Sequence, residues 1–506
     1  MVGSSSVSRL ADTCPPAYIS RMTEPNLMGL KAAVRTQTVD ERIAAGKEAR
    51  KQRPRVGLAE FTVAANRPDP VALLASQEDI RVQALLPLRH QRMSVSPFTF
   101  YRGSAVVMAN DLASMPNSGL VAQICGDAHL SNFGMFAAPD RDLVFDINDF
   151  DETNPGPFEW DVMRLAASFV LAGRDVKLSD EAIANAATAV GFSYRTQMAS
   201  YAGMPDLEIW YDRVSVEVMQ QWAKQEGMPG AEKRLQQGAA KARTRDAWSA
   251  ISKMTELVDG KRQFKELPPL LMRVPLNDEG FELIRTVFAE YRDTLAPDRA
   301  QLMRRYKIID FAHKVVGVGS VGLLAFVLLM QGRDEDDLLV VQVKEAVASV
   351  LEPFTAPSAY PYSGERVVAG QQIMQAASDV FLGWVRGPRG KDFYVRQLRD
   401  MKFSVDPANF NDSSLLAYAI ACGRTLARAH ARAGDAVAIN SYLGTSSKFD
   451  KAIKDFAIAY SDQVEVDYAA YTKAIADGHV QVAAPDEGEH YRIVASASDG
   501  ISVVTG

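Results

Sequence analysis

The sequence predicts an α+β protein with two lobes and additional helices. Its 506 residues suffice for two lobes with elaborations, and 47% hydrophobic with 23% charged residues is typical of a globular chain. Short apolar runs separated by turn residues cluster between residues 313 and 402, where they predict a β-sheet. Helical periodicity dominates most of the chain on both sides of this cluster.

The chain before the predicted sheet divides into two segments. We expect residues 1–85 to be peripheral, because their charged run TQTVDERIAAGKEARKQRPR is typical of a solvated helix. Within residues 86–312, the stretch GLVAQICGDAHLSNFGMFAAPDRDLVFDINDFDE predicts a strand, a polar loop and a β-hairpin. The amphipathic run EWDVMRLAASFVLAGRDV predicts a helix, and a helical insert follows it to about residue 311.

Residues 313–402 predict three strands, a helix and two more strands. In chain order they are HKVVGVGSVG, LLAFVLLMQG, DLLVVQVKEA, GERVVAGQQIMQAASD, VFLGWVRG and KDFYVRQL. The 18 uncharged residues between Lys314 and Arg333 approach the length of a membrane span, but four glycines and several β-branched residues favour strands. We therefore expect no membrane association. Residues 403–506 return to helical periodicity.

Composition excludes several classes of protein. The net charge of −6 and a pI near 5.7 argue against nucleic acid as a partner, which would require a basic surplus. The three cysteines are far apart and form no C-x-x-C, which excludes a disulfide framework and a thiolate zinc site. Together with the absence of a signal-like N-terminus, this predicts a reduced, cytoplasmic setting.

The polar loop between the predicted strand and hairpin carries the first candidate site. Asp127 and Asn132 are five residues apart, so the carboxylate can orient or deprotonate a hydroxyl while the amide oxygen holds a cation. The hairpin ends in further carboxylates, and alternation along a strand would put Asp149 and Asp151 on one face. Several carboxylates with few basic residues beside them predict a site for a divalent metal.

This loop and hairpin resemble the catalytic loop and metal-binding strand of protein-kinase-like enzymes. Small-molecule kinases similar to aminoglycoside phosphotransferases have a Gly-Asp-x-His-x-x-Asn loop. The resemblance implies that Asp127 is catalytic and that Asn132 and Asp149 bind metal. Supporting roles fall to further residues that stand close to the motif: His129, Asp151 at the Gly of Asp-Phe-Gly, and Asp161, which could accept backbone N–H bonds from the loop. Cys125 stands where these enzymes usually have His.

A second constellation resembles the lobe of protein kinases that binds ATP. Gly317, Gly319, Ser320 and Gly322 lie in a G-x-G-x-x-G between two predicted strands, the arrangement that covers ATP phosphates in kinases. Lys344 follows 22 residues after Gly322 and resembles the lysine of V-A-I-K. Glu365 would be its ion-pair partner. Backbone groups around Gln397 and Leu398 would meet adenine.

The lobes stand in the reverse of the usual order, because the glycine loop begins 185 residues after Asn132. We therefore predict a circularly permuted kinase-like fold. A linear order would instead use His430, Asp435 and an Asp455-Phe456-Ala457 motif, but helical spacing surrounds Asp455 and no hairpin is predicted there. In the permuted fold His430 and Asp435 could still line the site.

The long motifs RMSVSPFTFYRG, GDAHLSNFG, NDFDETNPGPFEWD, KVVGVGSVG and YVRQLRDMK resemble the bacterial domain-of-unknown-function family 2252, over residues 85–470. The expected activity comes from the kinase-like motifs: transfer of a phosphoryl group from ATP, with Mg²⁺ or Mn²⁺, to an unknown hydroxyl-bearing acceptor. Nucleotidyl (AMP) transfer and a non-catalytic nucleotide-binding pseudokinase are alternatives. A third is a metal-dependent hydrolase that uses Asp127, His129, Asp146 and Asp149.

Arg92 and Arg102 flank an aromatic segment and could meet phosphate, although a structural ion pair is the simpler interpretation of each.

Overall fold

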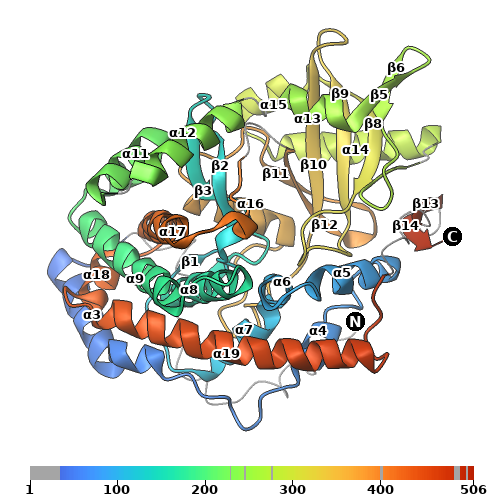
Figure 1. Cartoon of the computed structure of the whole chain (residues 1–506). Coiled ribbons are helices and arrows are strands. Elements are labelled where there is room, and N and C mark those ends of the chain that lie inside the picture. The colour runs from blue at the N-terminus through green and yellow to red at the C-terminus, as the bar shows by residue number, and fades with distance from the viewer. Residues whose placement is uncertain are drawn as a thin grey trace, which may run out of the picture.

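The computed structural model combines a helical body with a six-stranded antiparallel sheet (Figure 1). It describes residues 35–227, 229–243, 247–274, 277–398, 403–483, 491–496 and 500–505. The helical body contains α3 (Val39–Gln52), α4 (Pro70–Ala75), α5 (Leu86–Met93), α6 (Pro97–Gly103), α7 (Ala105–Ser114), α8 (Phe158–Asp175), α9 (Asp180–Ala202), α10 (Asp206–Tyr211), α11 (Val216–Gln225), α12 (Pro229–Arg243), α17 (Asp412–Ala433), α18 (Ala436–Leu443) and α19 (Lys448–Ala476).

The six-stranded sheet has the order β11-β12-β10-β9-β8-β7. Its strands are β7 (Leu271–Arg273), β8 (Lys307–Lys314), β9 (Ala325–Gln331), β10 (Leu338–Ala346), β11 (Gly383–Arg386) and β12 (Asp392–Gln397). β9 and β10 are rich in aliphatic and β-branched residues, which favour a strand buried on both faces. In β10, Lys344 is opposite Ala325 on one side and Tyr394 on the other.

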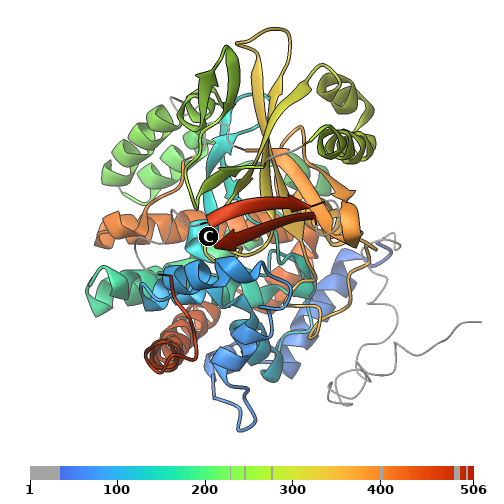
Figure 2. The same cartoon turned by 90° about the vertical axis from the view of Figure 1, so that its right-hand side faces the viewer.

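Helices and a small hairpin cover the two faces of this sheet (Figure 2). One face buries Phe326, Val341 and Val395 against α14 (Asp278–Asp293) and α15 (Pro297–Met303). The other packs against α13 (Ala247–Met254) and the hairpin of β5 (Thr255–Val258) and β6 (Lys261–Phe264). α16 (Ser363–Met374) contacts β11 and β12. Near the C-terminus, β13 (Tyr491–Ser496) pairs with β14 (Gly500–Thr505).

Two short strand pairs set the polar loops of the helical body side by side. The chain runs through β1 (Val121–Ile124), the 3₁₀ turn Leu130–Asn132, the hairpin of β2 (Phe133–Ala137) and β3 (Leu143–Ile147), and β4 (Asn154–Pro157). Since β1 pairs with β4 and β2 pairs with β3, the loop before the hairpin and the loop after it must be neighbours. This pairing brings Asp127 close to Asp149.

The α+β class, the hairpin and the strands β9 to β12 agree with the sequence prediction. The predicted strand over 313–322 is wrong except for its first two residues, because β8 ends at Lys314 and the glycines that follow form a loop, and β5, β6 and β7 fall in the expected helical insert. Two segment boundaries also differ. The boundary expected between residues 312 and 313 falls inside β8, because the alternating run KIIDFAHK is already part of the sheet. The segment 1–85 is also less peripheral than expected. A Cβ on Gly46 of α3 would lie 2.1 Å from the backbone oxygen of Ala438, so α3 packs tightly against α18.

Two further expectations concern the apolar run and the linear motif order. Among the described residues, none of the helices has the length and apolarity that a bilayer crossing requires. Asp455 lies within the long helix α19, and Asn440 lies within α18, so neither belongs to a catalytic loop followed by a hairpin. The structure therefore favours the first constellation over the linear one.

Candidate functional site

The loop that carries Asp127 is held by hydrogen bonds to Asp161. The amides of Cys125 and Gly126 donate to the Asp161 carboxylate at 2.8 Å and 3.0 Å, as the sequence analysis expected. Gly126 has a φ of +76°, and a Cβ there would lie 2.4 Å from the Glu152 backbone oxygen. Only glycine combines this conformation with such a close approach between the two polar loops.

His430 lies behind the site and does not line it. Its Nε2 is 3.2 Å from the Asp161 carboxylate, and its Nδ1 is 2.9 Å from the hydroxyl of Tyr194. The imidazole is completely buried. His430 therefore supports Asp161, which in turn holds the loop.

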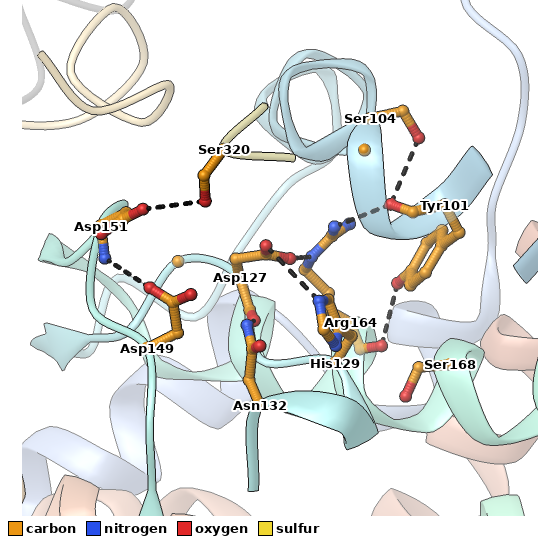
Figure 3. A network of polar contacts seen from close by, with 12 residues as sticks. Tyr101, Ser104, Asp127, His129, Asn132, Asp149, Asp151, Arg164, Ser168 and Ser320 are labelled. Carbon is orange, nitrogen blue, oxygen red and sulfur yellow. Dashed lines mark hydrogen bonds and ion pairs between the residues drawn. The ribbon is translucent and has the colours of Figure 1, made fainter. Parts of the chain in front are cut away.

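Asp127 points into the pocket and is fixed by Arg164 (Figure 3). The Nε of Arg164 donates to one carboxylate oxygen at 2.5 Å, and the Nε2 of His129 lies 3.7 Å from the other. Burial raises the pKa of Asp127, although the Arg164 guanidinium opposes this shift. A raised pKa suits a group that must take up a proton near neutral pH.

Asn132 is tied to the same loop by its amide nitrogen, which donates to the backbone oxygen of Asp127 at 2.8 Å. Its side-chain oxygen is not used in this bond. The backbone oxygen of Asn132 accepts a hydrogen bond of 2.7 Å from the amide of Asn148, directly before Asp149. Asn132 and Asp149 consequently line one pocket.

Asp149 and Asp151 have different partners. Asp151 accepts hydrogen bonds from Lys344 and, at 2.8 Å, from the hydroxyl of Tyr394. Burial alone would raise the pKa of Asp151, but the Lys344 ammonium lowers it below the ordinary value. Burial and the adjacent charge of Asp151 raise the pKa of Asp149, whose carboxylate lies 3.9 Å from Lys344. Asp149 is the carboxylate that would gain most from a cation.

The ion pair expected between Lys344 and Glu365 is not formed. The ion-pair partners of Lys344 among the described residues are Asp149 and Asp151. Glu365 is half-buried at the start of α16, and the next residue, Arg366, occupies the inward position. Arg366 donates to the backbone oxygens of Asp151 and Thr153. The helix therefore contacts the metal-side loop through Arg366.

The glycine loop is held by its carbonyl groups and keeps several amides free. Arg81 donates to the oxygens of Gly319 and Val321 at 2.8 Å and 2.7 Å, and Arg92 donates to that of Gly317 at 2.6 Å. Within the part of the chain that the structure describes, five amides of the loop donate no hydrogen bond: those of Gly317, Val318, Gly319, Ser320 and Gly322. Unpaired amides around glycines with positive φ form a cradle for anions.

These groups line one pocket of about 110 Å³ between the glycine loop and the two polar loops. Among its lining residues are Arg102, Asp127, His129, Asn132, Asp149, Asp151, Gly317, Gly319 and Ser320. The hydroxyl of Ser320 lies 3.5 Å from the Asp151 carboxylate, so the loop closes over it (Figure 3). Pockets for drug-sized ligands are usually about 300–1,000 Å³, so this one is small.

Other predicted residues lie outside this pocket. Gln397 and Leu398 line a separate cavity of about 350 Å³, and their amides already donate to Asp379 and Val340. Asp435 caps α18 and pairs with Arg42 at 2.8 Å. Asp146 forms a buried ion pair with Arg428 at 2.6 Å and accepts a bond from the amide of Ala376, so it is not available to the hydrolase alternative.

Sequence reasoning missed the roles of Arg164 and Arg81. Arg164 follows Asp161 by three residues on α8, so the two side chains share a helix face, and this spacing is a signal that the sequence contained. Arg81 lies in the segment expected to be peripheral, more than 230 residues before the loop it binds. No local pattern reveals that contact.

Comparison with known proteins gives one family. A family model described as "Uncharacterized protein conserved in bacteria (DUF2252)" matches residues 81–474, which include both polar loops, the glycine loop and Lys344. No curated protein and no solved structure matches the chain.

Proposed function

The chain belongs to the bacterial family DUF2252, and we propose that it is an ATP- and Mg²⁺-dependent phosphotransferase with a circularly permuted, kinase-like fold. The proposal rests on one observation: residues that are distant in the sequence line the same pocket. Asp127, Asn132, Asp149 and the glycine loop line one pocket, although the loop begins 185 residues after Asn132. Lys344 of β10 reaches the carboxylates of the same pocket.

The strand order around Lys344 supports the kinase-like interpretation. The chain passes through β8, the glycine loop, β9, the lysine strand β10, the helix α16, and then β11 and β12. Glycine loop, lysine strand and helix follow each other in this order in the nucleotide lobe of protein kinases. The catalytic-loop segment precedes this lobe in the chain, which is the basis for proposing a permutation.

Asn132 and Asp149 would hold the cation. Hard divalent cations such as Mg²⁺ or Mn²⁺ prefer carboxylate and amide oxygens, and both residues offer one in the pocket. Among the described residues, no group of three or more His, Cys, Asp or Glu side chains is placed to hold a metal. A cation at Asn132 and Asp149 would therefore complete its coordination with nucleotide oxygens and water. When bound, it would neutralise phosphate charge.

The remaining groups have roles in positioning and proton transfer. The free amides of the glycine loop and the Lys344 ammonium would bind phosphates, once Asp151 releases the lysine. The oxygen of the acceptor hydroxyl forms a bond to the γ-phosphorus, and the bond from that phosphorus to the β–γ bridging oxygen breaks. ADP leaves with the electron pair, and the hydroxyl proton passes to Asp127. Arg164 holds Asp127 in place for this step.

Nucleotide entry requires an opening movement. A pocket of about 110 Å³ is too small for a triphosphate, and Ser320 lies close to Asp151 above it. We expect the glycine loop to move away from Asp151 when ATP binds.

We also expect a reducing, cytoplasmic environment, since Cys125 and Cys422 are buried free thiols.

Thermal unfolding with ATP and Mg²⁺ tests the proposal. Ligand at about 100 times its dissociation constant stabilises by about 2.7 kcal/mol, which gives a measurable rise in Tm. We expect this rise in wild type, and its loss in Lys344→Met and Asp149→Asn. Arg333→Gln, an exposed turn residue, is the matched control. No rise with ATP in wild type would reject the proposal.

Label transfer separates the alternatives. With ATP labelled at the γ-phosphate, phosphoryl transfer puts the label on an acceptor in a bacterial extract. With ATP labelled at the α-phosphate, only nucleotidyl transfer does so. Binding of ATP without transfer of either label would favour a non-catalytic nucleotide-binding protein.

A further inference from the structure

One cation in the pocket, Arg102, has no hydrogen-bond or ion-pair partner in the part of the chain that the structure describes. Two arginines line the pocket, and Arg81 donates to the oxygens of Gly319 and Val321. Arg102 makes no hydrogen bond or ion pair with any described residue, and its Nε is buried without a partner. Its guanidinium carbon lies 5.9 Å from the centroid of the Phe98 ring. The structural ion pair considered for Arg102 is thus absent from the described part of the chain.

Arg102 is half-buried, and its Nε is buried without a hydrogen-bonding partner, which is costly unless a ligand satisfies it. Burial of a charge without a hydrogen-bonding partner is unfavourable, and arginine is seldom buried in that way. We therefore expect an anionic ligand group beside Arg102 in this pocket. A phosphate oxygen would satisfy its Nε with a charge-assisted hydrogen bond.

The position of Arg102 identifies which phosphate this is. The side chain interacts electrostatically with both Asp127 and Asp149, the proposed base and the proposed metal ligand. Its backbone oxygen lies 3.2 Å from the position of a Cβ on Gly319, so the end of α6 touches the tip of the glycine loop. The group that passes between a metal ligand and a base, beneath a glycine loop, is the transferred phosphoryl group.

We propose that Arg102 binds the γ-phosphate of ATP and stabilises the phosphoryl group during transfer. This inference rests on the proposed function and adds a residue from outside the kinase-like motifs. Charge spreads over the equatorial oxygens of the phosphoryl group as the bond to ADP breaks, and an arginine supplied by the same chain can neutralise it. Arg102 changes no covalent bond itself. It acts on the same transfer of phosphoryl to the acceptor, with the proton passing to Asp127.

The test compares ATP with ADP, because the two differ by the γ-phosphate alone. Affinities of wild type, Arg102→Gln and Arg102→Lys are measured by titration calorimetry with each nucleotide and Mg²⁺. We expect Arg102→Gln to bind ATP about tenfold or more weakly, a loss of about 1.4 kcal/mol or more, with ADP affinity unchanged within about twofold, because a charge-assisted hydrogen bond to the γ-phosphate is lost. The ATP affinity of Arg102→Lys should lie between those of wild type and Arg102→Gln, because lysine keeps the positive charge but loses the forked geometry of the guanidinium. Arg333→Gln should match wild type.

Each result has a clear meaning. Equal loss of ATP and ADP affinity, or no loss of either, in a folded Arg102→Gln or Arg102→Lys protein would overturn the role of Arg102. If ADP binds wild type and this binding is lost in Lys344→Met, the proposed function survives that result. If wild type binds neither nucleotide, both the proposed function and this inference fail.

Discussion

Lys344 donates a hydrogen bond to Asp151, so the lysine of the sheet is neutralised by the loop that follows the β2–β3 hairpin. Lys344 is almost completely buried, at 3% exposure of its side chain. Asp151 also accepts a bond from Tyr394. The pair joins β10 of the six-stranded sheet to the loop after the β2–β3 hairpin, and it engages the lysine that the proposed function assigns to phosphates.

A double-mutant cycle on this pair should show strong coupling. Removing one partner of a buried ion pair leaves an uncompensated charge and costs about 3–5 kcal/mol. We expect Lys344→Met and Asp151→Asn each to lower the free energy of unfolding by about that amount, and the double variant by clearly less than their sum. The exposed pair Arg285 and Glu282 serves as control and should couple by less than about 1 kcal/mol. Additive effects at Lys344 and Asp151 would contradict the pairing.

Gly126→Ala should destabilise the protein more than Gly119→Ala. Both glycines have positive φ, +76° and +73°, so the backbone strain of the two alanines is similar. A Cβ at Gly126 would collide with the Glu152 backbone at 2.4 Å, whereas a Cβ at Gly119 meets nothing within 4 Å. We expect the unfolding free energy of Gly126→Ala to be lower by about 1–3 kcal/mol, measured by urea denaturation. Equal values would show that the two polar loops can separate freely.

The polar loop and the hairpin were predictable because their signals are local. The five-residue spacing of Asp127 and Asn132 and the turn at Pro139 lie within one short stretch. Strand alternation does not place Asp149 and Asp151, however, because β3 already ends at Ile147. Asp161 was predicted from its local position, since it begins the next helix. These features depend on the neighbouring chain and not on distant packing.

The expected contacts that the structure lacks, and the contacts that the sequence did not predict, depend on packing between distant segments. Glu365 and Arg366 are adjacent on α16, and which of them faces the site is decided by how the helix packs on β11 and β12. Arg102 and Arg81 come from segments whose sequence carries no kinase-like motif. Arg67, also in the segment expected to be peripheral, forms buried ion pairs with Asp111 and Asp467. Periodicity cannot identify such partners.

Glu152 should make stability fall as the pH rises through the weakly acidic range. Burial raises the pKa of Glu152 to about 7, against an unfolded value of 4.5. Between these two values the folded protein binds more protons than the unfolded chain, so the free energy of unfolding decreases with increasing pH. Below 4.5 the contribution is complete, and above 7 it is lost. In Glu152→Gln we expect this decrease to be smaller by up to about 1.4 kcal/mol per pH unit.

The measurement for Glu152 is urea unfolding of wild type and Glu152→Gln at several values between pH 4.5 and 7.5. Asp127 and Asp149 also have raised pKa values and are present in both proteins, so the difference between the two curves isolates Glu152. Parallel curves would mean that Glu152 titrates normally in the folded protein.

Asp435→Ala should reduce stability without affecting nucleotide binding. The carboxylate of Asp435 accepts bonds from the amides of Val437 and Ala438 at the start of α18, and it pairs with Arg42. Loss of an N-cap costs about 0.5–2 kcal/mol. In the permuted assignment the ATP–Mg²⁺ rise in Tm is therefore retained in Asp435→Ala, while Asp149→Asn loses it. If Asp435→Ala abolished the rise and Asp149→Asn kept it, the linear order of motifs would be the correct one, because Asp435 would then hold the catalytic position.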